Sequence, residues 1–300
     1  MSTLRRNLLK AICRFNRLHQ SYPGRWRLCR FLASQTEALK TIPAGPIAVG
    51  PKTCLFIDPQ QRTNGLKIYV HGLNPREPLA NIAVQVLRLG DTVIDIGANV
   101  GYFSALCSLS IGPSGRVLSY EAAPGTYQRL QTLSQKNLHR NITTFPYAVS
   151  NEAGEITFHC GPAEHSGIAS IRPLGEKSLG AITVKAIALD DILDELPKIR
   201  LVKIDVEGAE TLVALGMQKL IERDRPYVIT EVTDSFLRQL GSDKHQLLNA
   251  FTRHGYTAHR IGRQVTEYAR EDPEFQCDLI LVPEGHAIPG FSTSLVRIGT

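Results

Sequence analysis

Residues 91–102 read Asp-Thr-Val-Ile-Asp-Ile-Gly-Ala-Asn-Val-Gly-Tyr, and this stretch decides the fold class. Its residues 93–96 form a short, mostly β-branched run of the kind found in strands that are covered on both faces. Asp95 lies inside this run, where an acid is costly to bury unless it has a partner or a function. Gly97 and Gly101 bracket the turn that follows, after which a helical pattern begins. A strand, a glycine turn and a helix in this order predict a parallel α/β sheet with a ligand site at the turn.

The spacing within this turn narrows the choice of ligand. Residues 97–101 lack the second glycine that allows a dinucleotide pyrophosphate to lie against such a turn, so nicotinamide and flavin cofactors are disfavoured. Glu121 follows the next predicted strand, where a carboxylate can accept hydrogen bonds from both hydroxyls of a ribose. A ligand with a ribose and no pyrophosphate fits both observations, and we predict S-adenosylmethionine.

From Leu79 onward, helix and strand patterns alternate. They predict a Rossmann-like, doubly wound α/β domain over residues 79–300, with a mostly parallel sheet of seven strands behind an N-terminal cap of residues 1–78. The predicted helices are 79–89, 101–110, 124–138, 208–223 and 243–254, and the predicted strands are 92–96, 116–120, 142–146, 199–205, 226–231, 255–261 and 277–282.

Three further segments fall outside this alternation. In the cap, residues 54–57 and 67–70 are predicted to be short strands. Residues 155–188 resemble an inserted hairpin around a loop rich in glycine, serine and proline, and we expect its residues 160–181 to help select the substrate. The tail comprises residues 283–300.

A second group of charges occurs in residues 203–210, Lys-Ile-Asp-Val-Glu-Gly-Ala-Glu. On a strand, Lys203, Asp205 and Glu207 would share one face, and three charges at the end of an interior strand are costly unless paired or functional. Glu231 ends another predicted strand in the same way. Since the carboxyl ends of parallel strands meet at one edge of the sheet, we expect an acid-lined cleft beside the glycine turn.

Taken together, these motifs resemble the FkbM family of S-adenosylmethionine-dependent methyltransferases, which act mainly on oxygen. The matches run from about Glu77 to Val232 in the family's order and comprise residues 93–104, Asn137, residues 148–150, residues 203–210, and Pro226 before the strand that ends in Glu231. The block 203–210 is the most distinctive of them. Residues 121–124, Glu-Ala-Ala-Pro, depart from the family, which usually has Pro-Asn-Pro after the acid.

The resemblance implies a cofactor site at the glycine turn, with Ala148 near the adenine. The predicted cofactor-binding residues are Asp95, Gly97, Ala98, Asn99, Gly101, Tyr102, Glu121 and Ala148. The predicted reaction is transfer of a methyl group to a hydroxyl of a sugar, a glycan or a secondary metabolite. Two other classes stay open, a noncatalytic module that binds a cofactor or a partner, and an NAD-dependent oxidoreductase that shares the sheet.

Asp205, Glu207 and Glu231 are the predicted catalytic residues. A hydroxyl acceptor must lose its proton, and we expect Asp205 to take it while the two glutamates position the acceptor or raise the pKa of the base by repulsion. Alternatively, Asp205 and Glu207 pair with Lys203 and cap the helix near Gly208. These acids and a histidine could also bind a divalent metal, but no metal-ligand spacing is present, and no metal is predicted.

The net charge of +6 is concentrated at the N-terminus. Residues 1–30 contain eight arginines and lysines and no acid, so the remainder is slightly acidic and nucleic acid is not an expected partner. Leu4, Leu8, Ile12 and Phe15 recur at helical spacing. Residues 1–30 therefore fit a basic amphipathic helix on a lipid surface or a partner protein. The alternative, which we favour, is a solvated helix packed on the domain or a frayed terminus. Arg14 and Arg17 interrupt the apolar run that an export signal needs.

The six cysteines are scattered and contain no Cys-x-x-Cys pair, so neither a zinc site nor a disulfide framework is predicted. A reducing, cytoplasmic location is the expectation, with peripheral membrane contact through the basic segment as its variant. The sequence does not specify the acceptor or the oligomeric state.

Overall fold

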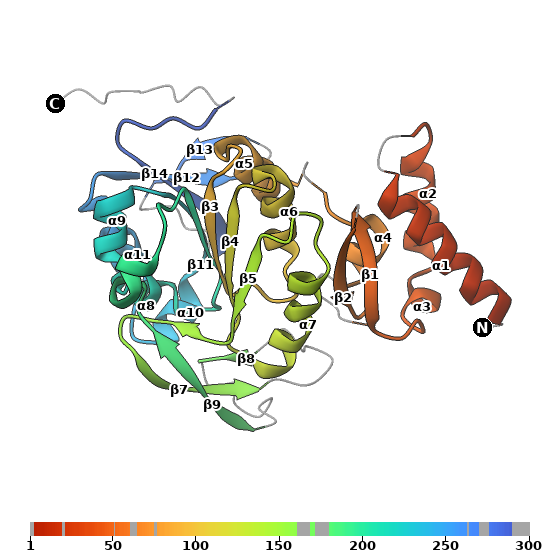
Figure 1. Ribbon diagram of the computed structural model, residues 1–300, viewed down its shortest axis with the longest axis horizontal. Coiled ribbons are helices and arrows are strands. Elements are labelled where there is room, and N and C mark those ends of the chain that lie inside the picture. Colours follow the sequence, from red (N-terminus) through yellow and green to blue (C-terminus); the bar gives the residue numbers. More distant parts are fainter. Residues whose placement is uncertain are drawn as a thin grey trace.

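The computed structural model in Figure 1 describes residues 3–19, 22–50, 52–60, 65–74, 77–160, 169–171, 180–262, 264–269 and 276–289. The helices are α1 (Thr3–Leu18), α2 (Arg25–Ser34), α3 (Thr36–Leu39), α4 (Gly65–His71), α5 (Pro78–Val86), α6 (Tyr102–Ile111), α7 (Pro124–Gln135), the 3-10 helix η3 (Leu189–Glu195), α8 (Glu210–Leu215), α9 (Gln218–Asp224), α10 (Asp234–Gln239) and α11 (Lys244–Thr252). The strands are β1 (Gly45–Gly50), β2 (Thr53–Ile57), β3 (Thr92–Ile96), β4 (Arg116–Tyr120), β5 (Ile142–Phe145), β6 (Ala148–Val149), β7 (Gly154–Cys160), β8 (Ala169–Ser170), β9 (Ala181–Ile187), β10 (Leu201–Ile204), β11 (Tyr227–Thr233), β12 (Tyr256–Ile261), β13 (Val265–Glu267) and β14 (Gln276–Pro283).

An eight-stranded sheet forms the centre, in the order β13-β12-β14-β11-β10-β3-β4-β5. Strands β11, β10, β3, β4 and β5 run parallel to one another, whereas β14 runs antiparallel to both β11 and β12. The predicted doubly wound, mostly parallel α/β fold is thus confirmed. The sheet has one strand more than the seven predicted, because the short β13 pairs with β12 at the edge.

Both faces of the sheet are covered, as the apolar strand patterns predicted. Alternate residues of one strand enter two different cores: Val93 packs with α5, α6, α7 and the cap, whereas Ile94 packs with α8, α9 and α11. Figure 1 shows these two groups of helices on opposite sides of the sheet. The period of two along each strand therefore sets which core a side chain enters.

The predicted helix 208–223 is two helices, α8 and α9, separated at Gly216 and Met217. A Cβ atom at Gly216 would lie 1.9 Å from the carbonyl oxygen of Ser150, so this backbone packs directly on the segment after β6. The hydrophobic period continues across the break, which is why the pattern indicated a single helix.

Beside the central sheet, β6, β7, β8 and β9 form a second, smaller sheet. The antiparallel pairing of β7 with β9 confirms the predicted hairpin strands. Much of the loop expected to select the substrate, residues 161–168 and 172–179, lies outside the described residues.

The cap contains α1 to α4 and the β1–β2 hairpin. The prediction of a strand at 54–57 is confirmed by β2, but the predicted strand at 67–70 is wrong, because these residues lie in α4. Side chains of α1 bind the last carbonyls of α4: Asn16 Nδ2 donates to Val70 O at 2.7 Å, and Arg17 Nη1 donates to Tyr69 O. This tertiary capping of a helix end outweighs the strand preference of an Ile-Tyr-Val sequence.

Helix α1 packs on α4 and β1. Its inner side is buried, and Leu9 and Cys13 belong to the same apolar cluster as the helices on that face of the sheet. The interpretation of residues 1–30 as a helix packed on the domain therefore fits α1. Among the described residues, no helix combines the length and the apolar character required to cross a bilayer.

Candidate active site

The glycine turn after β3 lies at the carboxyl edge of the sheet. Gly97 has a φ of +74°, and a Cβ atom there would lie 1.9 Å from the Asp205 carbonyl oxygen. Gly101 has a φ of +88°, and a Cβ atom there would lie 2.4 Å from Leu133 Cδ2. Both glycines are thus required by tight packing between chain segments, in addition to any approach of a ligand. Ala98, between them, is buried and donates its N–H to Tyr120 O at 2.9 Å.

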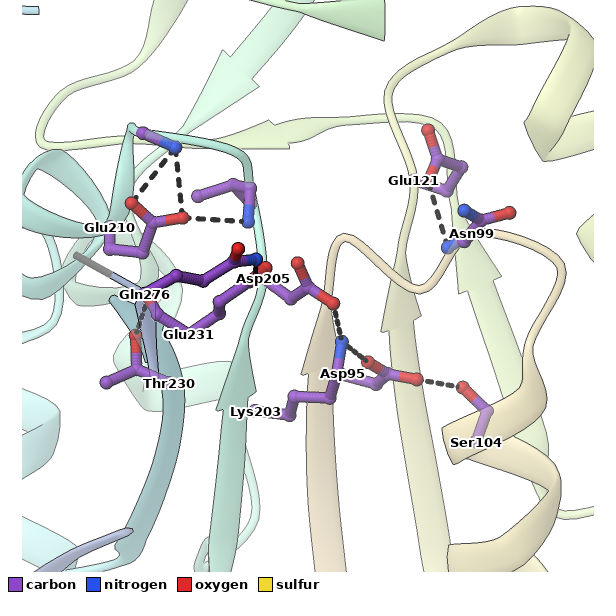
Figure 2. A network of polar contacts seen from close by, with 12 residues as sticks. Asp95, Asn99, Ser104, Glu121, Lys203, Asp205, Glu210, Thr230, Glu231 and Gln276 are labelled. Atoms are coloured by element: carbon purple, nitrogen blue, oxygen red, sulfur yellow. Dashed lines mark hydrogen bonds and ion pairs between the residues drawn. The ribbon is translucent and has the colours of Figure 1, made fainter. Parts of the chain in front are cut away.

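Asp95 is fully buried at the end of β3. Ser104 Oγ donates to its Oδ2 at 2.5 Å, and Lys203 Nζ lies 3.7 Å from its Oδ1 (Figure 2). Burial raises the pKa of Asp95, while Lys203 and the Ser104 hydroxyl oppose this shift. The parallel register of β3 and β10 places Asp95 beside Lys203, so the acid inside this apolar strand is paired.

Glu121 lies at the end of β4, opposite the glycine turn. Its Oε2 accepts the N–H of Asn99 at 3.0 Å, and its Oε1 accepts the N–H of Ala123 at 2.9 Å. Asn99 has a left-handed φ of +52°, which aims this N–H at the carboxylate. Burial raises the pKa of Glu121 to about 7, although the two N–H donors oppose the shift. The residue is partly exposed, so the carboxylate is fixed in direction and open to a ligand.

Two other predicted cofactor residues lie around this turn. The Tyr102 hydroxyl, at the start of α6, accepts the N–H of Asn74 at 3.0 Å and donates to Glu77 Oε2 at 3.2 Å. Burial raises the pKa of Tyr102 to about 12. Its hydroxyl thus ties the turn to the end of the cap. Ala148 is buried in β6 and pairs with Ala186 of β9.

Lys203 and Asp205 connect β10 to the glycine turn. Lys203 Nζ donates to Asp205 Oδ2 at 2.9 Å, and Figure 2 shows it between the two aspartates. Burial lowers the pKa of Lys203, but the carboxylates of Asp205 and Asp95 outweigh burial, and the net shift is upward. The lysine therefore stays charged, and the Asp205 side chain remains 38% exposed beside it.

Glu231, in β11, is adjacent to Asp205. Gln276 Nε2 donates to Glu231 Oε1, and Asp278 lies opposite Glu231 in the neighbouring β14. Burial and the Asp205 charge raise the pKa of Glu231 to about 7, and a hydrogen bond with Asp205 adds to the shift, whereas Gln276 opposes it. Burial and Asp205 also raise the pKa of Asp278. Asp205, Glu231 and Asp278 thus form a carboxylate cluster beside one lysine.

The prediction that Glu207 shares a strand face with Lys203 and Asp205 is wrong. Strand β10 ends at Ile204, and Glu207 lies in the turn beyond it with a left-handed φ of +56°. A non-glycine residue in that region costs of order 1 kcal/mol or more, so the turn is held by other contacts. The structure does not place Glu207 on the face of the sheet strand that the alternation predicted.

Glu210 supplies those contacts. It is buried at the start of α8, where its Oε1 accepts the N–H groups of Val206 at 3.2 Å and Gly208 at 3.1 Å, and its Oε2 accepts Gly208 N at 3.0 Å (Figure 2). The alternative prediction was that Asp205 and Glu207 cap this helix, whereas the first-turn acid Glu210 holds the turn. The sequence signal for this role is that Glu210 lies in the first turn of the predicted helix, where an acid can accept hydrogen bonds from free backbone N–H groups.

The sequence also missed groups that come from other parts of the chain. Gln276 and Asp278 belong to an antiparallel strand, so they do not occur at a strand end followed by a glycine. Glu77 belongs to the segment that joins the cap to α5. Only the pairing of β14 with β11 could have brought Asp278 to the site. Among the described residues, no group of three or more His, Cys, Asp or Glu side chains is arranged to hold a metal ion.

The fold and the site together define a class: a doubly wound α/β protein with a fixed carboxylate after its second parallel strand and a lysine-linked carboxylate cluster at the same edge. A family model confirms this assignment. The chain belongs to the methyltransferase FkbM domain family, whose model matches residues 95–258, more than half of the chain. The matched range contains the glycine turn, Glu121, the Lys203 to Glu210 block and Glu231.

The individual relatives have low sequence identity to this chain. The hexuronic acid methyltransferase AglP of Haloferax volcanii is 26% identical over 165 residues, which is 54% of this chain and 64% of that protein. The chain thus spans less than two thirds of this curated relative. A solved FkbM methyltransferase from Methylobacillus flagellatus KT is 16% identical, with 72% of this chain and 52% of that chain covered and a TM-score of 0.45. An S-adenosylmethionine-dependent O-methyltransferase from Thermotoga maritima is 11% identical, with 71% and 66% covered and a TM-score of 0.40.

Proposed function

We propose that this chain transfers the methyl group of S-adenosylmethionine to a hydroxyl oxygen of a sugar or glycan. The observation that supports this most is the arrangement at the sheet edge. Asp205 follows β10, the strand next to β3 and its glycine turn, and Glu231 lies in β11, the strand beyond β10. Membership of the FkbM family supports the methyltransferase class, and the hexuronic acid methyltransferase among its relatives supports a sugar as the acceptor.

Glu121 fits the ribose of the proposed cofactor. Its two oxygens are oriented by the N–H groups of Asn99 and Ala123, and the side chain remains partly exposed. A carboxylate has lone pairs left after two such bonds, and ribose hydroxyls can donate to them. When bound, S-adenosylmethionine supplies a methyl carbon on a positively charged sulfur. Asp95 supports the cofactor site in this proposal by forming an ion pair with Lys203. Ala98, Tyr102 and Ala148 are proposed to contact the cofactor, as the family resemblance implied.

The Asp205–Glu231 pair is the proposed proton acceptor. A general base works best when its pKa lies near the operating pH, and the pKa of Glu231 is raised to about 7. Glu231 interacts with Asp205, and Lys203 Nζ donates to Asp205 Oδ2. Asp205 and Glu231 therefore remove the hydroxyl proton, while Glu207 in the adjacent turn helps to position the acceptor.

Calorimetric titration tests the cofactor. The full chain is titrated with S-adenosylmethionine, S-adenosylhomocysteine and, as a negative control, NAD. Micromolar binding of the first two, weakened at least tenfold in Asp95→Ala and Glu121→Ala but unchanged in the exposed-site control Glu152→Gln, supports the proposal. Binding of NAD instead would favour an oxidoreductase.

Transfer is then tested with S-adenosylmethionine carrying a labelled methyl group and a panel of neutral sugars, uronic acids and oligosaccharides. Alkali-stable label on a sugar supports O-methylation. Tight cofactor binding without transfer to any acceptor would contradict the proposed reaction and favour a noncatalytic cofactor-binding module. We also propose a cytoplasmic location, as expected from the scattered cysteines. The five cysteines with described side chains are free thiols, which fits a reducing compartment.

A further inference from the structure

Helix α1 presents an apolar stripe to the solvent on the side opposite its packed face. The buried residues Leu9 and Cys13 point into the cap, while other apolar residues recur at spacings of three, four and seven positions on the outside. The outer residues are Leu4, Leu8, Phe15 and Leu18, with 81%, 59%, 48% and 38% of their surface exposed. At 100° per residue these four side chains lie within about a quarter of the helix circumference. The helix is therefore apolar on two sides, and the domain covers only one.

The neighbouring helix α2 also exposes aromatic side chains. Trp26 and Phe31 are 58% and 47% exposed. The guanidinium groups of Arg27 and Arg30 lie over the Trp26 ring, 5.4 and 5.0 Å from its centroid. Figure 1 shows α1 and α2 at the outer edge of the molecule, with α4 and β1–β2 between them and the central sheet. We call these outward residues of α1 and α2 the outer cap face.

The charged residues of α1 and α2 all have one sign. Residues 1–30 contain no Asp or Glu. Arg5 and Arg14 are exposed and, by helical geometry, flank the apolar stripe of α1 on opposite sides, and Arg27 and Arg30 are exposed on α2. Long basic side chains beside an apolar stripe can keep their cations at a polar boundary while the stripe is buried.

We propose that the outer cap face docks on the surface of an anionic lipid bilayer. Exposed apolar residues that lie together mark an interaction surface, and the charges identify the partner. Anionic headgroups complement the arginines, acyl chains take up the leucines and Phe15, and the Trp26 ring suits the level between them. A second copy of this chain is a poorer partner, because a two-fold interface would set two basic, acid-free segments against each other.

The contact is peripheral. The apolar stripe covers one side of a 16-residue helix whose other side is packed on the cap, so α1 can enter only the headgroup region and the adjoining acyl chains. Docking leaves the carboxyl edge of the sheet free, because that edge is formed by β3, β4, β10 and β11, not by the cap helices.

Vesicle binding of the full chain tests this inference. Trp26 is the single tryptophan, so intrinsic tryptophan fluorescence reports directly on the outer cap face. With vesicles of phosphatidylcholine containing about 30% phosphatidylserine, we expect cosedimentation and a blue shift of the emission, both weakened by added salt. Vesicles of phosphatidylcholine alone should bind at least tenfold more weakly.

Two variants locate the contact. Leu8→Ser with Phe15→Ser keeps Trp26 and should lower vesicle binding roughly tenfold or more, because it removes exposed apolar area. Arg14→Glu with Arg30→Glu should lower binding to anionic vesicles by a similar factor. The matched control, Leu89→Ser with Lys198→Glu, changes an exposed leucine and an exposed lysine outside the cap and should bind as the parent does. Circular dichroism establishes that each variant is folded.

Absence of vesicle binding at physiological ionic strength would overturn the inference, as would equal loss in the control variant. Light scattering tests the alternative of contact between copies. If the parent protein is a dimer, does not bind vesicles, and is dissociated by Leu8→Ser with Phe15→Ser, the outer cap face is a contact between two copies of this chain. Neither readout uses methyl transfer, so the inference stands or fails independently of the proposed function.

Discussion

Glu121 and Glu231 are carboxyl groups held near the point of titration at neutral pH. The physical cause differs in part: Glu121 is desolvated between two N–H donors, whereas Glu231 is desolvated and also faces the Asp205 charge. Both pKa values are raised to about 7. Each carboxylate is therefore less stable in its charged form than that of an ordinary glutamate. A ligand that binds the charged form can shift its protonation strongly near neutral pH.

The first prediction concerns Glu121 and cofactor affinity. Ribose hydroxyls bind the charged carboxylate, and with a pKa of about 7 that form is scarce at pH 6 and dominant at pH 8. The affinity for S-adenosylhomocysteine should therefore rise roughly tenfold between pH 6 and pH 8. Glu121→Gln should bind more weakly and lose this rise, whereas Glu152→Gln, at an exposed turn, should behave as the parent. Calorimetry at three pH values measures both; a pH profile in Glu121→Gln that matches the parent would exclude the ribose contact.

The second prediction concerns the Asp205–Glu231 pair and turnover. The rate should rise with pH to a plateau above about 7, because Glu231 must lose its proton before it can accept one from the acceptor hydroxyl. Either Asp205→Asn or Glu231→Gln should lower kcat by about 100-fold or more while cofactor affinity changes little. Labelled-methyl transfer across pH 5.5–9 measures this. Near-normal turnover in both variants would remove the base assignment.

Glu231 also makes a stability prediction with a definite sign. Its pKa is raised in the folded state, so folding favours the protonated form and stability is lost as pH rises from about 4.5 to 7. Glu231→Gln removes the penalty and should gain about 1 kcal/mol at pH 8 and little at pH 4.5. Urea titration at the two pH values checks the difference. A loss of stability at pH 8 would mean that the Gln276 contact outweighs the charge penalty.

At the scale of elements, the site depends on close contact between the turns after β3 and β10. The missing side chain of Gly97 is what allows the Asp205 carbonyl to lie against the glycine turn. The Asp205–Gly208 turn is held in its left-handed conformation by Glu210. These two backbone features place the Asp205 side chain, so its position is determined by the meeting of two elements.

Replacing Gly97 tests this arrangement. Gly97→Ala combines a φ of +74° with a Cβ 1.9 Å from a carbonyl oxygen, so we expect a loss of about 3 kcal/mol or more and little remaining cofactor binding. Gly125→Ala is the matched control, because nothing lies within 4 Å of its Cβ in the first turn of α7, and it should be neutral or slightly stabilising. Thermal unfolding of both variants gives the comparison; a stable, cofactor-binding Gly97→Ala protein would contradict the packing argument.

At the scale of the whole molecule, the cap and the sheet share one apolar cluster. That cluster contains Leu9 and Leu32 of the cap together with Val93 and Ile280 of the central sheet. Arg17 is buried within the cap, where its Nε donates to Ala48 O at 3.0 Å and its guanidinium lies 4.7 Å from the Tyr69 ring centroid. A continuous core transmits unfolding of one part to the other, even though the proposed boundary lies near residue 78.

We therefore predict that the cap and the catalytic domain unfold in one cooperative transition. Differential scanning calorimetry should show a single peak whose calorimetric and van't Hoff enthalpies agree. Arg17→Met leaves two buried carbonyl oxygens without this donor and should lower the single transition by several degrees without splitting it. Two resolved peaks in the parent protein would show that the cap is an independent unit.

The amino-acid sequence by itself determined the sheet and half of the site. Periods of two and 3.6 residues, interrupted by glycine turns, are local properties, and they placed β3 and β4 at the observed residues. The same locality placed Asp95, Glu121, Asp205 and Glu231 at one edge, since acids near the carboxyl ends of neighbouring parallel strands lie on the same side of the sheet. The local strand preference of residues 67–70 led to a wrong prediction, because contacts with α1 stabilise a helix there.

Only the tertiary structure decided how these groups act on one another. Whether Asp205 pairs with Lys203, whether Glu210 holds the turn, and which carboxyl has its pKa raised depend on distances between segments far apart in the chain. Asp278 reaches the site through an antiparallel strand. The outward apolar stripe of α1 likewise follows from which side the cap covers. Periodicity identifies the faces of an element, but burial, charge coupling and exposure are set by what packs against each face.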